Sequence, residues 1–309
     1  MFGFFKNQDR NVPAWAAFFD WKEYERFMEE LDLYFKLRGL NYEVEQGIVT
    51  VSEREEEVGK LGLTNIAQIC KQHQADEYGE LLTAHLDGML GKRESDKKLM
   101  DHVGDFRIIR DYIAIRLHNL DSVSIVGQDN LIGFSVAGDI FAMLVFDLPE
   151  SIVNVQRKHT DAWGKTDEEL IELGLRNVRE RNPIELVRHQ LGDNPIYFVT
   201  AEHYFSGNFI FELDEHPNLI GTHGTLVGIP HRHTALFFPI QDIGVLDGLN
   251  RLLPIIHGMH QEGPGSLSNH LFWYHQQQFI DLPYVVDQGE LTFHPPAAFV
   301  EMLNGLAEE

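Results

Sequence analysis

Residues 224–242, GTLVGIPHRHTALFFPIQD, predict two apolar strands joined by a tight polar turn at Pro230-His231-Arg232-His233. Apolar and β-branched residues fill both arms, and the basic residues lie in the turn between them. This pattern is typical of a hairpin in a buried antiparallel sheet. The stretch therefore favours a fold with antiparallel strands, and it places one candidate functional turn in the chain.

The rest of the chain alternates helix signals with hairpin signals. Residues 13–38 carry aromatic side chains at helical spacing, and residues 41–51 predict a hairpin around Gln46-Gly47. Thr166 and Glu169 form a capping box that opens the clearest helix of the chain. Another strand is expected at 271–280 and a closing helix at 295–306. Because hairpins dominate, we expect an α+β fold of mainly antiparallel strands with interleaved helices.

The length of 309 residues suits two domains. The polar stretch Gly91–Asp101, GKRESDKKLMD, is the best candidate for an internal linker. We therefore expect a helix–hairpin–helix α+β region at 1–100 and a larger antiparallel α+β domain at 101–309.

The charge balance is strongly acidic, with 25 Lys and Arg against 48 Asp and Glu and a formal net charge of −23. Such a surface repels phosphate backbones, so we expect no nucleic-acid partner and allow for a protein partner that the charge attracts. No run approaches the roughly 20 apolar residues of a membrane span, and no signal peptide is recognisable. We expect a cytoplasmic protein with no membrane partner, whose oligomeric state the sequence leaves open.

His231 and His233 are the candidate metal ligands, because alternate residues of an extended strand face the same side. A third ligand would have to come from elsewhere, among His203, His223, Asp242, His257 and His260. A second histidine pair, His257 and His260, has helical spacing, but Pro254 and Gly258 argue against a continuous helix there. The sequence predicts no cofactor, or alternatively a divalent transition metal such as zinc at His231 and His233.

No catalytic motif is complete. Gly164-Lys165-Thr166 has the end of a phosphate-binding loop, but His159 stands where the upstream glycine is required. The dinucleotide fingerprint, the nucleophile elbow and the zincin motif do not occur in the sequence. The single cysteine, Cys70, lies in an apolar-periodic run, which indicates a buried packing thiol.

From about Asp147 onward, the order of signals resembles the YtpQ family, a bacterial domain family of unknown function. The matching segments are the Trp163 turn with its helix to Val178, Asn194–Phe198, Ala201–Leu213 and Val227–His233. The family tends to carry Asn and Asp around the arginine, where this chain has His231 and His233. Arg232 is therefore the residue that the resemblance supports, as a ligand contact or as a lock on the turn. The resemblance implies no activity.

Two functions follow as hypotheses. The first is a non-catalytic binding or regulatory protein whose acidic surface meets a protein partner. The alternative is a metal-dependent hydrolase-type enzyme that uses the His-x-His hairpin site. A ligand sensor with a pocket between the two regions ranks third.

Overall fold

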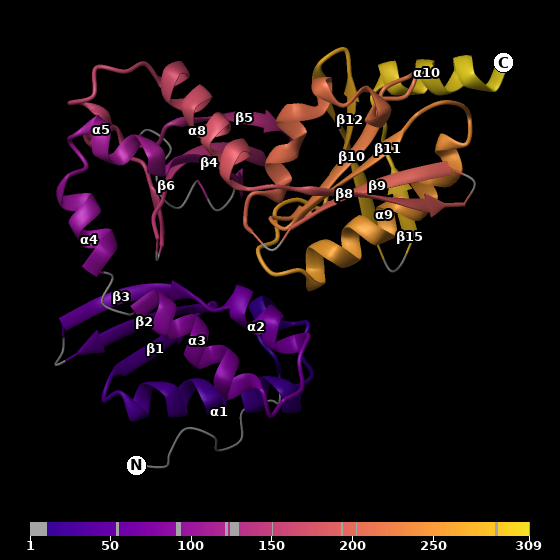
Figure 1. Cartoon of the computed structure of the whole chain (residues 1–309). Helices are drawn as coiled ribbons and strands as arrows, with labels where there is room; N and C mark the ends of the chain where they lie inside the picture. The colour runs from indigo at the N-terminus through magenta and orange to yellow at the C-terminus, as the bar shows by residue number, and fades with distance from the viewer. Residues whose placement is uncertain are drawn as a thin grey trace. The chain divides into compact units, whose positions relative to one another are not determined.

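The computed structural model describes residues 11–53, 56–90, 94–120, 123, 130–149, 151–192, 194–201, 203–287 and 290–308. The chain divides into two compact units, Met1–Lys92 and Arg93–Glu309 (Figure 1). Helices and antiparallel sheets are interleaved along the chain, which confirms the predicted α+β class. No helix within the described ranges is both long and apolar enough to cross a membrane.

In its described residues, the first unit has a three-stranded antiparallel sheet of order β1-β2-β3 and three α-helices. Its elements in chain order are η1 (Ala14–Ala16), α1 (Trp21–Leu37), β1 (Asn41–Glu45), β2 (Ile48–Glu53), β3 (Glu56–Gly62), α2 (Thr64–Lys71) and α3 (Tyr78–Leu90). Asp20 and Glu23 form a capping box at the start of α1. The predicted Gln46-Gly47 turn is present, and both residues have positive φ, as a two-residue hairpin turn requires.

The core of the first unit contains Cys70, which is buried as predicted. Burial in apolar surroundings raises the pKa of its thiol to about 12, so the thiolate is scarce at neutral pH. Cys70 is a packing residue.

The second unit contains two larger sheets. Between residues 94 and 181 its elements are α4 (Glu94–Asp101), α5 (Phe106–Ile109), η2 (Arg110–Tyr112), β4 (Ile113–Asn119), β5 (Gly133–Ala137), β6 (Ile140–Asp147), β7 (Ile152–Asn154), α7 (Arg157–Thr160) and α8 (Asp167–Arg181). These strands form a four-stranded antiparallel sheet in which β6 lies between β4 and β5 and also pairs with β7.

The remaining elements are β8 (Glu185–Leu191), β9 (Asn194–Thr200), η4 (Ser206–Glu215), η5 (Pro217–Leu219), β10 (Thr225–His231), β11 (Thr234–Pro239), α9 (Val245–Glu262), β12 (Leu271–His275), β13 (Gln278–Leu282), β14 (Tyr284–Asp287), β15 (Glu290–Phe293) and α10 (Ala297–Glu308). A six-stranded antiparallel sheet has the order β13-β12-β10-β11-β9-β8, and β14 pairs with β15. One core cluster contains buried residues from both large sheets, including Leu117 of β4 and Ile229 of β10.

Buried amides fix β4 in place. Asn177 of α8 donates to the carbonyls of Arg110 and Ile113, at 2.9 and 2.8 Å. On η4, Asn208 donates to the carbonyl of Ile115 at 2.7 Å. A buried amide that satisfies a strand carbonyl holds that strand more specifically than apolar contact alone.

Two local predictions are wrong, and a third holds in part. The division between the units, at Lys92 and Arg93, falls within the expected linker, but helix α4 occupies residues 94–101 of it, and residues 91–93 lie outside the described residues. Helix α9 continues through Pro254 and Gly258 to Glu262, because its buried face on the six-stranded sheet outweighs the lost backbone hydrogen bond. The single strand expected at 271–280 is the hairpin β12–β13, whose turn residues Gln276 and Gln277 both have positive φ.

Candidate functional site

The β10–β11 turn is tight and fixed by backbone contacts. The arms pair as predicted, with His231 opposite Thr234 and a register shift after Gly228. Within the turn, the backbone N–H of His233 donates to Nδ1 of His231 at 3.3 Å. The backbone N–H of Arg232 donates to the carbonyl of Gly265 at 3.1 Å. The main chain of Arg232 therefore helps to lock the turn, and its guanidinium is left for another role.

His231 and His233 lie together, with ring centroids 6.1 Å apart and an angle of 51° between the rings. Burial lowers the pKa of His231 to about 4, with further lowering from His233 and His260. Burial also lowers the pKa of His233. Both imidazoles are therefore neutral at ordinary pH, which is the form that binds a metal.

Within the described part of the chain, no group of three or more His, Cys, Asp or Glu side chains could hold a metal ion. Some of the side chains considered as a third ligand make contacts of their own: Asp242 Oδ1 with Gly244 N at 2.8 Å, His203 Nδ1 with Phe205 N at 3.2 Å, and His257 Nε2 with Gln261 Nε2 at 2.8 Å. The zinc site at His231 and His233 stays a prediction.

The guanidinium of Arg232 has a different environment from a surface arginine. Its Nε is buried and has no hydrogen-bond partner within the described residues, and it forms no ion pair there. The side chain lies against Gly265, which has φ +74°, and a Cβ placed on that glycine would be 3.2 Å from Nη1 of Arg232. Glycine at 265 thus leaves room for the arginine stem.

A second arginine of this kind, Arg116, lies on β4. Arg116 and His118 share one face of the strand, because they are two residues apart. Arg116 Nε and His118 Nε2 are both buried and, among the described residues, lack a hydrogen-bond partner. The sequence contains a signal for them. Arg116 interrupts the apolar run of residues 113–117 and His118 follows it, and a charged residue in such a strand requires an explanation.

Tyr204 links the two arginines. Its ring centroid lies 5.5 Å from Cζ of Arg116 and 5.2 Å from the ring of His233, and its side chain is exposed. Tyr204 is also a neighbour of Arg232. We call Arg116, His118, Tyr204, Arg232 and His233 the arginine cluster.

In the arginine cluster, burial and nearby positive groups disfavour the charged forms of Arg116 and His118. Burial and repulsion from Arg232 lower the pKa of Arg116 to about 9. Burial and both arginines lower the pKa of His118 to about 3. Asp147 is the carboxylate that attracts Arg116, but within the described ranges the two form no ion pair, and burial raises the pKa of Asp147. An anion bound beside these basic groups would raise the pKa of each of them.

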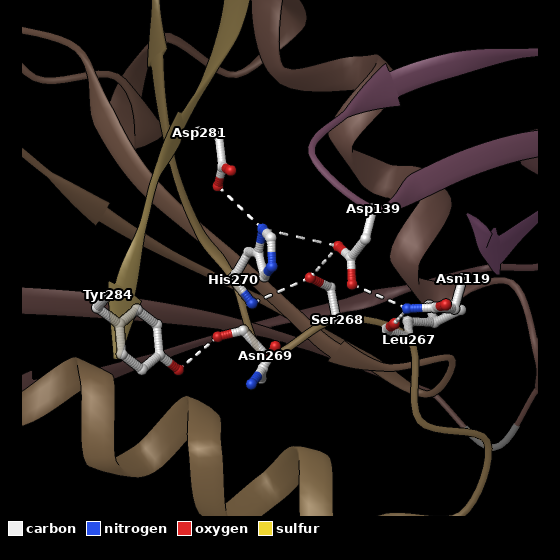
Figure 2. A network of polar contacts seen from close by, with 8 residues as sticks. All are labelled: Asn119, Asp139, Leu267, Ser268, Asn269, His270, Asp281 and Tyr284. Atoms are coloured by element: carbon white, nitrogen blue, oxygen red, sulfur yellow. Dashed lines mark hydrogen bonds and ion pairs between the residues drawn. The ribbon is translucent and has the colours of Figure 1, made fainter. Parts of the chain in front are cut away.

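A second polar cluster of this unit is satisfied internally (Figure 2). Asp139, in the β5–β6 turn, accepts from Asn119 Nδ2 at 2.8 Å and from the hydroxyl of Ser268. Nδ1 of His270 lies 3.1 Å from Oδ1 of Asp281. Although it combines serine, histidine and aspartate, this is no nucleophilic site. Ser268 is fully buried and its hydroxyl donates to the carboxylate, whereas His270 contacts Ser268 through its backbone N–H. We call Asn119, Asp139, Ser268, His270 and Asp281 the Asp139 clasp.

Two surface cavities, of about 230 and 270 Å³, lie along α8. Part of their charged lining is already paired within each cavity. In the first, Arg179 pairs with Glu212 at 3.2 Å, and in the second, Lys165 pairs with Glu169 at 2.8 Å. The arginine cluster, whose charges lack such partners in the described part of the chain, is the better candidate site.

Comparison of the chain with protein-family models, with curated proteins and with solved structures found no match.

Proposed function

We propose that this protein is a non-catalytic binding protein, and that its second unit binds a small carboxylate or phosphate anion at the arginine cluster. One observation carries the proposal. Arg116 and Arg232 are close enough to lower the pKa of Arg116, and the buried Nε of each lacks a partner among the described residues.

Buried polar groups without partners cost free energy, and a bound anion would reduce this cost. A buried polar group without a partner costs about 1–3 kcal/mol, and a charged one costs more. Within the described ranges, the buried side-chain nitrogens without a partner are Arg116 Nε, His118 Nε2, Arg232 Nε and His257 Nδ1. The first three of these belong to the arginine cluster. Guanidinium groups bind carboxylate and phosphate oxygens through charge-assisted, bidentate hydrogen bonds, so one bound anion would satisfy both arginines.

Binding is favoured over catalysis by the state of the histidines. A general base works best when its pKa lies near the working pH. The pKa values of His118 and His231 are lowered to about 3 and about 4, so their imidazoles are weak bases. A neutral His118 is suited to donate one hydrogen bond to the anion.

Isothermal titration calorimetry with three probes, inorganic phosphate, inorganic sulfate and acetate, tests the proposal. We expect at least one probe to bind the intact protein, and Arg116→Gln and Arg232→Gln each to weaken it about tenfold to a hundredfold. Arg188→Gln, on the exposed face of the edge strand β8, is the matched control and should bind like the natural protein. Equal binding by all four proteins, or no binding of any probe, would overturn the proposal.

Four further expectations are proposals of their own. A protein partner of the acidic surface would appear in a pull-down whose yield falls with salt, because the attraction is screened. The zinc alternative at His231 and His233 predicts a near-stoichiometric metal content in the purified protein, and a content below about a tenth of an equivalent argues against it. Membership of the YtpQ family and a cytoplasmic location are proposed from the sequence.

A further inference from the structure

The Asp139 clasp joins the two large sheets of the second unit (Figure 2). Asp139 belongs to the turn between β5 and β6 of the four-stranded sheet, while Ser268 and His270 lead into β12 of the six-stranded sheet. Asn119 Nδ2 donates both to Asp139 Oδ2 and to the carbonyl of Leu267, at 2.8 Å each. The end of β4 is thereby tied to residues 267–270.

The Asp139 clasp also contains charged groups around the imidazole of His270. Its Nδ1 lies 3.1 Å from Asp281 Oδ1 and 4.0 Å from Asp139 Oδ1, so one imidazole faces two carboxylates. The titratable groups that face it are Asp139 from the β5–β6 turn, Asp281 from β13 and His260 from α9. Gly138, with φ +51°, allows this approach, since a Cβ there would lie 3.0 Å from His270 Nδ1.

The clasp is continuous with the arginine cluster on both sides. On one side, Asn119 ends the strand that carries Arg116 and His118. On the other side, Leu267 N donates to the carbonyl of Pro230 at 2.9 Å, and Arg232 N donates to the carbonyl of Gly265 at 3.1 Å. The two arginines therefore come from the two segments that the clasp holds together.

We propose that Asn119 and Asp139 are positioning residues that hold Arg116 and Arg232 at the separation needed to share one anion, and that protonation of His270 strengthens this hold. The inference rests on the proposed anion site and names its regulation. Asn119 and Asp139 touch no ligand in this account and act through the two segments that they connect.

The direction of the pH effect follows from the ion pair. The hydrogen bond with Asp281 raises the pKa of His270, with a further raise from Asp139 against the opposing effect of burial. The protonated ring is present in full below the ordinary pKa of about 6.5, and its charge is lost as pH rises through the raised pKa. Above that pH two carboxylates face a neutral ring, and the hold on the arginines weakens. Anion affinity should therefore fall as pH rises.

Sulfate is the probe that isolates this effect, because it keeps its charge across the relevant pH range. We expect its dissociation constant for the natural protein to rise roughly fivefold between about pH 6 and about pH 8.5. His270→Gln keeps a hydrogen-bonding side chain without the titrating charge, so its affinity should change less over the same range. Asn119→Ala changes no charge and should weaken sulfate at every pH, which separates positioning from a direct effect of the imidazolium field.

A second measurement, the pKa of His270 with and without sulfate, tests the same coupling without comparing affinities. If His270 protonation strengthens anion binding, saturating sulfate must raise the pKa of His270 by the same factor, and an NMR titration of its ring measures this. Sulfate binding with equal pH slopes in the natural protein and His270→Gln, and with no change in the His270 pKa, overturns the inference and leaves the anion site standing. Undetectable binding of all three probes at every pH overturns the anion site, and the inference with it.

Discussion

Each unit of the protein places an arginine over a tyrosine ring, and the two arrangements differ in what completes them. In the first unit, Cζ of Arg38 lies 3.8 Å from the ring centroid of Tyr34, and Asp87 accepts from Arg38 Nη2 at 2.7 and 2.9 Å. The hydroxyl of Tyr34 donates to the same carboxylate at 2.8 Å. In the second unit, Arg116 lies 5.5 Å from the ring of Tyr204. No carboxylate of the described residues completes that pair.

The difference separates a structural arginine from a binding one. Arg38 has its counter-charge built into the fold, so nothing from outside is needed. Arg116 and Arg232 are half-buried and form no ion pair within the described part of the chain, and burial lowers their pKa values. A fold keeps an uncompensated buried charge at a cost in stability, which an anion from solution would remove.

The largest expected effect is stabilisation by an anion. At a sulfate concentration of 100 times the dissociation constant, the free energy of unfolding of the second unit should rise by about 2.7 kcal/mol. The Arg116→Gln/Arg232→Gln double variant should lose this gain, and Arg38→Gln should keep it. Thermal unfolding with and without sulfate measures the difference, and an equal gain in all three proteins would remove the distinction between the units.

Next in size is the effect of removing the buried charge when no anion is supplied. Arg116→Met should raise the free energy of unfolding by about 1 kcal/mol without ligand, because the desolvation of this half-buried charge outweighs its attraction to Asp147, with which it forms no ion pair within the described residues. Arg38→Met should not stabilise, since it leaves Asp87 without its partner. Urea denaturation in a buffer free of multivalent anions checks both. A loss of stability in Arg116→Met as large as in Arg38→Met would contradict the account.

The third effect is the fall of the free energy of unfolding at acid pH, which is smaller per pH unit. The pKa of His118 is lowered to about 3 and that of His231 to about 4, so below about pH 6.5 the unfolded chain binds protons that the native site refuses. Stability should therefore fall as pH falls, by at most about 1.4 kcal/mol per pH unit for each histidine. His118→Leu should flatten the slope of stability against pH, because it removes an imidazole that the native site keeps neutral. An unchanged slope in His118→Leu would show that this imidazole is not held neutral.

The smallest effect belongs to the satisfied pair. Arg38 and Asp87 are partly exposed, with 33% and 50% of their side-chain surfaces accessible, so solvent screens their attraction. A double-mutant cycle with Arg38→Gln and Asp87→Asn should give a coupling of about 0.5 kcal/mol. A coupling above about 2 kcal/mol would mean that the first unit depends on this pair far more than its exposure implies.

Local signals in the sequence were sufficient for much of the fold. The 225–240 hairpin, the Thr166–Glu169 capping box and the Gln46-Gly47 turn all depend on residues close in the chain, and all three are present. The course of α9 through Pro254 could not be read in this way, because it depends on burial against a sheet whose strands come from distant parts of the chain. The β12–β13 turn was missed because Gln276 and Gln277 adopt positive φ without the glycine or asparagine that usually marks such a turn.

In the candidate site, too, the local features could be predicted from the sequence and the long-range contacts could not. His231, Arg232 and His233 could be singled out because they interrupt an apolar hairpin, and the structure brings the two histidine rings to 6.1 Å. Arg116 could be noticed in its strand, but its proximity to Arg232 could not, because it depends on how two separate sheets meet. His231 and His233 suggested a metal site in the turn. Because Arg116 of β4 lies near the turn, Arg232 is the more informative residue.

The most direct test of the central claim is an NMR correlation spectrum of the arginine Nε–H groups during a sulfate titration. The account predicts that the signals of Arg116 and Arg232 move together toward hydrogen-bonded positions, with one dissociation constant, while the signal of Arg38 stays in place. Stationary Arg116 and Arg232 signals at saturating sulfate would contradict it.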